Sequence, residues 1–330
     1  MSKGVLSRLM PAFVLLAVIV AITPFIMSSP FWLDNSVIVA VFSLMALSVG
    51  MAYGQAGILS MAPAAFGSVG AFATSIVTVH YGLSPLVGLV LALVLPMLLA
   101  YPMARAITRL SALPLSIATI LLSLVLEHAI REGGDFTGGY IGLSGIPSPW
   151  FAADLLSMHA LAWLLVFVVL VLYANLTHSA VGRAVKTARH DPLRATADGV
   201  NVPSLLAVYF ALSAAVAGLA GWIYAHHLTY MGPDSLTMHV SIRVLLMAVV
   251  GGASTLLGPV LGAAFLTLIT LYLPAAETQG MIFGAVLIFV LLVAPNGVLG
   301  TDWRKLFKRQ VASAPTTSAH PQSVARGGQA

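Results

Sequence analysis

The sequence predicts an all-α integral membrane protein with about ten transmembrane helices and both termini in the cytoplasm. Composition is the first observation: 59% of the 330 residues are hydrophobic and only 8% are charged. A soluble domain carries roughly a quarter charged residues. The second observation is that apolar stretches of about 20 residues, long enough for a helix to cross a bilayer, recur along the chain. The third is that the positive charges gather in a few segments between them.

Hydropathy and turn residues delimit the predicted spans. Gly and Pro cluster at the breaks, as in Ser28-Ser29-Pro30 and Gly232-Pro233-Asp234. The eighth and ninth spans are short and meet in a Gly-rich junction, so they are either two helices or one broken helix. The predicted spans are residues 10–28, 34–52, 62–80, 85–104, 113–131, 158–176, 204–226, 240–254, 258–273 and 280–298.

The distribution of Lys and Arg predicts the orientation. An even number of spans places both termini on one side, together with 13 of the 15 Lys and Arg residues; only Arg131 and Arg243 fall elsewhere. An odd number would move the basic cluster at 304–309 to the other side. Because cytoplasmic loops carry the excess of Lys and Arg, the shared side is predicted to be cytoplasmic. Its cations are Lys3, Arg8, Arg105, Arg109, Arg183, Lys186, Arg189, Arg194, Arg304, Lys305, Lys308, Arg309 and Arg326.

We expect one transmembrane domain over residues 1–300, followed by a tail over 301–330. Within the domain, residues 132–157 are rich in Gly, Ser and Pro and are predicted to form an external loop. The tail begins basic and then has almost nothing to bury, which is typical of disorder. The chain has no GxxxxGK[ST] phosphate-binding loop, so it is not expected to hydrolyse ATP itself.

Residues 177–203 form a charged, helix-compatible segment, here called the island, between two apolar spans. A short helix bounded by Gly182 and Gly199 can lie across the membrane surface and insert into a groove on a cytoplasmic partner. The alternative is a basic loop that neutralises anionic lipid head groups. The acids Asp191 and Asp198 favour the protein partner, because a lipid-binding loop has no use for them.

Two Gly-rich stretches, 50–72 and 250–263, are candidates for a transport pathway. Each is either a tight helix contact with an ordinary turn or a broken helix beside a substrate pathway. Broken helices at corresponding positions of two halves point to a transporter's central site. Neither stretch contains an acid, which argues against a proton or sodium relay. The candidate pathway residues are Gly54, Gln55, Gly57, Ser60, Pro63, Gly251, Gly252, Gly258 and Pro259.

Nothing in the sequence predicts an enzyme active site or a metal centre. The chain contains no cysteine, which excludes thiolate ligands. A metal site built from His226, His227 and His239 is disfavoured because adjacent histidines on a helix point apart. No Ser/His/Asp triad or carboxylate pair stands out, so we predict no catalytic residues.

In order and spacing, these segments resemble the permease subunit of branched-chain amino acid ABC importers, over about residues 34–300. Four blocks carry the resemblance: Gly54-Gln55-Ala56-Gly57-Ile58-Leu59-Ser60 with Ala64-Ala65-Phe66 and Gly70-Ala71; Gly182-Arg183-Ala184-Val185-Lys186-Thr187-Ala188-Arg189 with Ala195 and Gly199-Val200-Asn201-Val202; Ala217-Gly218-Leu219-Ala220-Gly221; and Val250-Gly251-Gly252-Ala253-Ser254 with Gly258-Pro259-Val260-Leu261-Gly262-Ala263.

The resemblance implies the ABC importer permease fold, in a multi-pass protein of the bacterial inner membrane that works by alternating access. It implies four kinds of partner besides lipid: a second related permease, identical or different, two cytoplasmic ATP-binding subunits, and a periplasmic substrate-binding protein. Those ATP-binding subunits would use ATP-Mg, and this chain would bind no cofactor. The residues implied to couple the permease to the ATPase are Gly182, Arg183, Ala184, Arg189, Asp191, Ala195 and Gly199.

One departure from the family pattern leaves the substrate open. Family members often have Gly-His where this chain has Met61-Ala62-Pro63. Relatives also take urea, short amides and aromatic compounds, so the substrate is a branched-chain amino acid or one of these. The alternative functions are an ion-coupled secondary transporter that works without an ATPase, and a membrane scaffold or receptor. The absence of acids from the Gly-rich stretches and the coupling-like island speak against the secondary transporter.

Overall fold

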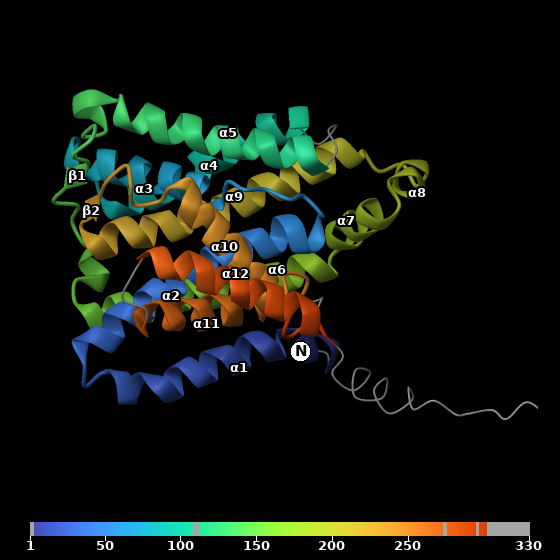
Figure 1. Ribbon diagram of the computed structural model, residues 1–330, viewed down its shortest axis with the longest axis horizontal. Coiled ribbons are helices and arrows are strands. Elements are labelled where there is room, and N and C mark those ends of the chain that lie inside the picture. Colours follow the sequence, from blue (N-terminus) through green and yellow to red (C-terminus); the bar gives the residue numbers. More distant parts are fainter. Residues whose placement is uncertain (1–2, 108–111, 273–275, 295–296, 302–330) are drawn as a thin grey trace, which may run out of the picture. The chain divides into compact units, whose positions relative to one another are not determined.

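The computed structural model describes residues 3–107, 112–272, 276–294 and 297–301, and most of them are helical (Figure 1). The α-helices are α1 Lys3–Ile26, α2 Pro30–Val49, α3 Pro63–Val79, α4 Pro85–Ile107, α5 Ala112–Arg131, α6 Leu155–His178, α7 Ala180–His190, α8 Pro192–Ala197, α9 Val202–Leu228, α10 Met238–Gly251, α11 Gly258–Tyr272 and α12 Ala276–Val293. The remaining elements are the π-helix η1 Gly50–Gln55, the 3-10 turns η2 Gly134–Phe136 and η3 Trp150–Ala152, and the strands β1 Leu143–Ser144 and β2 Tyr230–Met231.

Among the described residues, six helices are long and apolar enough to cross a membrane, judged by length and composition: residues 8–26, 30–55, 85–106, 114–131, 155–178 and 202–228. Four shorter apolar helices lie at residues 63–79, 238–251, 258–272 and 280–290. Each predicted span overlaps one of these helices. The eighth and ninth spans are two helices, α10 and α11, separated by residues 252–257. The number that crosses the bilayer and the orientation stay predictions.

Proline sets several helix starts. Pro30, Pro63, Pro192 and Pro203 occupy the first turn of α2, α3, α8 and α9. Proline has no N–H group, and at these positions the helix loses no hydrogen bond, because first-turn N–H groups have no acceptor within the helix. The turn signal at residues 28–30 therefore opens α2, which starts four residues before the predicted span at 34.

Small residues let the central helices approach closely. α9 packs extensively on α3 and α4. A side-chain carbon added to Gly221 would overlap the backbone of Gly67, and one added to Gly218 would overlap the carbonyl oxygen of Ala92. Helices in lipid gain no hydrophobic drive toward one another, so close backbone packing supplies the attraction. The Ala217–Gly221 block of the sequence is therefore a packing surface.

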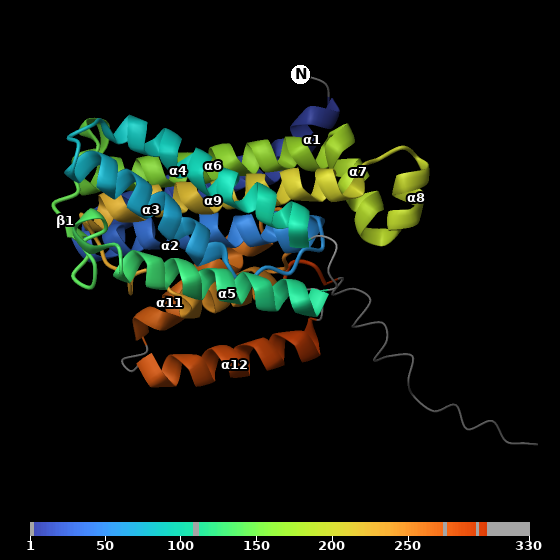
Figure 2. The same cartoon turned by 90° about the horizontal axis from the view of Figure 1, so that it is seen from above.

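The loops gather at the two ends of the helices, as Figures 1 and 2 show. α7 and α8 project at the end where α1 begins. The segment between α5 and α6 lies at the opposite end, and β1 pairs there with β2, Leu143 against Met231 and Ser144 against Tyr230. Arg109 and the predicted tail after Thr301 lie outside the described residues.

Candidate coupling and pathway site

The first Gly-rich stretch leaves the helix at the end of α2. The helix continues into the π-helical turn η1, and non-helical backbone follows to α3. Gly57 has a backbone φ of 72°, a conformation that glycine adopts without strain. The hydroxyl of Tyr173 on α6 donates to the carbonyl of Gly50 at 3.1 Å and holds the π-helical turn. π-helical turns of this kind are frequent at functional sites.

Three hydroxyls of α5 hydrogen-bond the non-helical backbone. Ser116 donates to the carbonyl of Leu59 at 3.3 Å, and Ser123 donates to the carbonyl of Met61 at 3.3 Å. The Oγ1 of Thr119 accepts from the amide of Met61 at 3.0 Å. Such partners are required wherever backbone leaves a helix away from water. These three hydroxyls were not predicted from the sequence, although their i, i+3, i+7 spacing places them on one helix face.

The second Gly-rich stretch turns the chain between α10 and α11. Gly252 ends α10 with a φ of 109°. A side-chain carbon at Gly251 would overlap the backbone of Gly258, the first residue of α11, where Pro259 follows. The two glycines therefore allow two short helices to fold back on each other with their backbones in contact.

The two Gly-rich stretches, far apart in sequence, touch each other. Gln55 donates from Nε2 to the carbonyl of Ser254 at 3.2 Å. A side-chain carbon at Gly54 would overlap the carbonyl oxygen of Ala253. The end of α2 and the α10–α11 turn are thus packed backbone against backbone.

A small cavity adjoins the start of α3. Its hydroxyl groups come from Ser48, Ser60 and Ser213, and the rest of its wall is apolar. Ser60 and Pro63 are the predicted pathway residues that line it, and the other candidates lie elsewhere. None of its lining residues, all in the described part of the chain, is charged. The hydroxyls of Ser48 and Ser213 already donate to the carbonyls of Met45 and Phe210, and the cavity offers no counter-charge.

The island folds as α7 and α8. The side chain of Ser179 accepts from the amide of Gly182 at 3.2 Å and caps α7. Gly182, Val185 and Ala188 form the buried face of α7. A side-chain carbon at Gly182 would overlap the carbonyl of Leu176, so the turn from α6 into α7 requires glycine. Ala184 is half-buried beside this face.

α8 is a short capped helix that carries an exposed apolar side chain. Asp191 accepts from the amide of Arg194 at 3.0 Å. Ala195 is buried, and its carbonyl accepts a hydrogen bond from the amide of Val200 at 3.0 Å. Gly199, after the helix, has a backbone φ of 82°. Leu193 is 84% exposed. Asp191 therefore has a local use as a helix cap, and its presence does not by itself favour a protein partner over lipid.

Replacing Asp191 by alanine is expected to fray α8, at a cost of about 1 kcal/mol to the helix, because the N-cap acceptor is lost. Asp191→Asn keeps a capping oxygen and should behave like the parent chain. Hydrogen exchange of the amides at residues 193–197 measures the difference. Equal exchange in the alanine and asparagine variants would contradict the capping role.

The two arginines of the predicted coupling set donate to different parts of the molecule. Arg183 donates from Nη1 to the carbonyl of His178 at 2.9 Å, where α6 ends. Arg189 donates from Nη1 to the carbonyl of Gly54, at the end of α2. A side-chain carbon at Gly57 would lie 3.2 Å from Cγ of Arg189. Arg189 thus connects the island to the first Gly-rich stretch.

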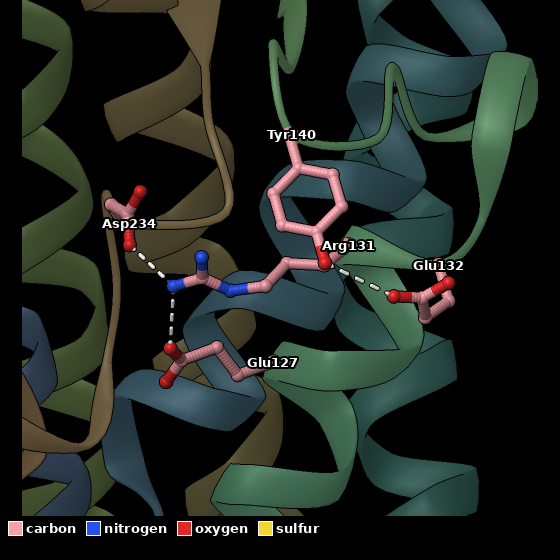
Figure 3. Close-up of polar contacts among 5 residues, drawn as sticks. All are labelled: Glu127, Arg131, Glu132, Tyr140 and Asp234. Atoms are coloured by element: carbon pink, nitrogen blue, oxygen red, sulfur yellow. Dashed lines mark hydrogen bonds and ion pairs between the residues drawn. The ribbon is translucent and has the colours of Figure 1, made fainter.

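At the opposite end, a polar cluster joins α5 to the loop after β2 (Figure 3). Nη2 of Arg131 lies 2.9 Å from Oε1 of Glu127 and 2.6 Å from Oδ1 of Asp234. The guanidinium lies 5.9 Å from the ring centroid of Tyr140, whose hydroxyl donates to Glu132 at 3.1 Å. Arg131 is one of the two cations outside the predicted basic side. Glu127 and Asp234 neutralise its charge at this end.

The adjacent histidines at the end of α9 point to different partners. His226 contacts the carbonyl of Pro147 through Nδ1 at 2.7 Å and the hydroxyl of Thr74 through Nε2 at 2.8 Å. His227 lies 2.9 Å from Oδ1 of Asp34. Among the described residues, no group of three or more His, Cys, Asp or Glu side chains is placed to hold a metal ion.

Several long apolar helices, broken helices in contact and a projecting charged island together define a multi-pass membrane protein of the permease class. Residues 31–291 match the family model described as the branched-chain amino acid transport system permease component, and the chain belongs to this family. The resemblance stated from the sequence is confirmed.

Curated relatives agree with this assignment. The high-affinity branched-chain amino acid transport system permease protein LivM of Salmonella typhimurium is 25% identical over 317 residues, covering 86% of this chain and 73% of the relative. LivH of the same organism is 30% identical over 215 residues, covering 61% and 67%. A probable LivH of Methanocaldococcus jannaschii is 25% identical over 284 residues, covering 80% and 90%. No solved structure matches the chain.

Proposed function

We propose that this chain is the transmembrane permease subunit of an ATP-driven importer in a bacterial inner membrane. It moves a branched-chain amino acid, or a related small amino acid or amide, by alternating access. The observation that carries the proposal is the family match over residues 31–291.

In this proposal the chain crosses the membrane ten times and both termini are cytoplasmic. α7 and α8 project at the end where α1 begins, which is expected when six crossings separate them (Figure 1). Arg105 near the end of α4 and the four cations of the island follow the positive-inside bias under this orientation. Four further crossings by α9 to α12 return the chain to the cytoplasm.

The proposed assembly contains a second homologous permease, two ATP-binding subunits that use ATP-Mg, and a periplasmic substrate-binding protein. The relatives named LivM and LivH are both permease proteins of one transport system, which supports a paired arrangement. The exposed Leu193 of α8, flanked by the cations of the island, offers an apolar contact within a basic surface for an ATP-binding subunit. The chain itself has no phosphate-binding loop.

Uptake of labelled leucine into proteoliposomes tests the proposal. We expect uptake only when the permease pair, the ATP-binding subunits, the substrate-binding protein and ATP are all present. The matched control uses ATP-binding subunits that bind but do not hydrolyse ATP. Labelled urea, a short amide and an aromatic acid, each with its own binding protein, test the substrate range. Uptake driven by an ion gradient without the ATP-binding subunits would instead support a secondary transporter.

A further inference from the structure

We infer that Arg189 is a positioning residue that transmits movement of the island to the broken end of α2, and is not a docking contact for the ATP-binding subunit. The inference rests on the proposed function, since it presumes that an ATP-driven partner moves the island. It assigns different roles to Arg183 and Arg189, which the family resemblance places together in the predicted coupling set.

The first step is the contact itself. Arg189 lies at the end of α7, and its Nη1 reaches the carbonyl of Gly54. The aliphatic part of its side chain passes beside Gly57. Within the described part of the chain, no carboxylate forms an ion pair with Arg189, so this guanidinium is bound by main chain.

The second step is the electrostatics of the acceptor. Gly54 belongs to the last turn of a continuous helical run from Pro30 to Gln55. The final carbonyls of a helix have no partner within it and carry partial negative charge. A guanidinium that donates to such a carbonyl forms a charge-assisted hydrogen bond, which is stronger than a neutral one. Arg189 therefore holds α7 firmly to the end of α2.

The third step is the contact between the end of α2 and the turn that joins α10 to α11. The backbone of Gly54 abuts Ala253, and Gln55 donates to Ser254 in the turn between α10 and α11. Backbone packed this closely cannot shift on one side alone, because interiors are close-packed and deform little. A displacement of α7 that presses Gly54 toward Ala253 displaces the α10–α11 turn through this packing, and one that pulls Gly54 away acts on the turn through the hydrogen bond of Gln55. One side chain thus links the island to both broken helices.

Arg183 provides the matched contrast. It lies on the same helix, is exposed as Arg189 also is, and carries the same charge. Its acceptor is the carbonyl of His178, at the junction of α6 and α7, so its hydrogen bond does not leave the island region. A substitution there changes the charge of the docking surface without breaking the link to Gly54.

The test compares Arg189→Gln with Arg183→Gln in the complete importer, reconstituted with its ATP-binding subunits and substrate-binding protein. Recruitment of the ATP-binding subunits, basal ATP hydrolysis and substrate uptake per ATP are measured. For Arg189→Gln we expect normal recruitment and hydrolysis, with uptake per ATP reduced about tenfold or more, the scale of one lost hydrogen bond to a charged group. Arg189→Lys keeps charge and one donor and should restore part of the uptake.

A second measurement follows the movement directly. Because the chain has no cysteine, single cysteines at Thr196 on α8 and Leu261 on α11 can each carry a spin label. Both labels should respond to ATP in the parent complex, and only the Thr196 label in Arg189→Gln. Reduced recruitment by Arg189→Gln, or an unchanged response at Leu261, would overturn the inference. A parent complex without ATP-dependent uptake would overturn the proposed function itself.

Discussion

Gly54→Ala is expected to abolish uptake although it adds a single methyl group. The added carbon would overlap the carbonyl oxygen of Ala253, so either the end of α2 or the α10–α11 turn must move. Overpacking of this kind costs about 1–3 kcal/mol even where side chains can yield, and here the obstacle is main chain. We expect less folded protein in the membrane, and at least about tenfold less uptake per folded molecule.

Gly284→Ala is the matched control for this substitution. Gly284 lies within α12, and no atom approaches within 4 Å of the position that its side-chain carbon would take. Alanine favours a helix over glycine by about 0.5–1 kcal/mol, so this variant should be neutral or slightly more stable. The same glycine-to-alanine change is therefore expected to destabilise the protein at position 54 and to leave it unchanged or stabilise it at position 284. Thermal unfolding in detergent and uptake at matched protein level measure both, and equal behaviour would refute the close contact at Gly54.

Removing the three α5 hydroxyls together is expected to unfold the non-helical segment before α3. The variant Ser116→Ala, Thr119→Val and Ser123→Ala leaves an amide and two carbonyls without these partners. The loss is about 2 kcal/mol if each bond has the average strength measured in membrane helices. It is about three times larger if each buried backbone group keeps its full desolvation penalty. The denaturation midpoint of the purified protein distinguishes these values.

Thr267→Val controls for the loss of a buried hydroxyl as such. The Oγ1 of Thr267 on α11 is buried, and no hydrogen-bond partner lies within the described residues. Its replacement by an isosteric methyl group should leave the midpoint unchanged or raise it. A triple variant as stable as Thr267→Val would show that the α5 hydroxyls do not support the segment.

The sequence revealed local features of the fold better than the contacts between distant segments. Several helix starts were predictable because proline is favoured in the first turn, and the breaks near Gly54 and Gly252 were predictable because glycine permits them. The contact of Gln55 with Ser254 spans 199 residues, and no local pattern encodes it. The buried faces of the long helices were also unreadable, because helices that are apolar on every side carry no amphipathic signal.

In the island, the residue type alone does not decide the role of a side chain. By residue type its acids favour a protein partner, yet Asp191 caps α8. The predicted coupling set contains both of its arginines that follow Gly182 on α7, and these differ in their acceptors: Arg189 donates to Gly54 and Arg183 to His178. The same side chains serve capping, internal bonding or docking, and only the three-dimensional neighbours decide among these uses.

The α5 hydroxyls also impose an order on biosynthesis. Leu59 and Met61 are made before their partners Ser116, Thr119 and Ser123, which follow 57 to 62 residues later. At about 5–20 residues per second, the ribosome needs roughly 3–12 s to supply them. During that interval the backbone around Met61 needs other hydrogen-bond partners, such as water, before it can lie at membrane depth. We therefore expect the segment between α2 and α3 to reach its final position only after α5 has emerged.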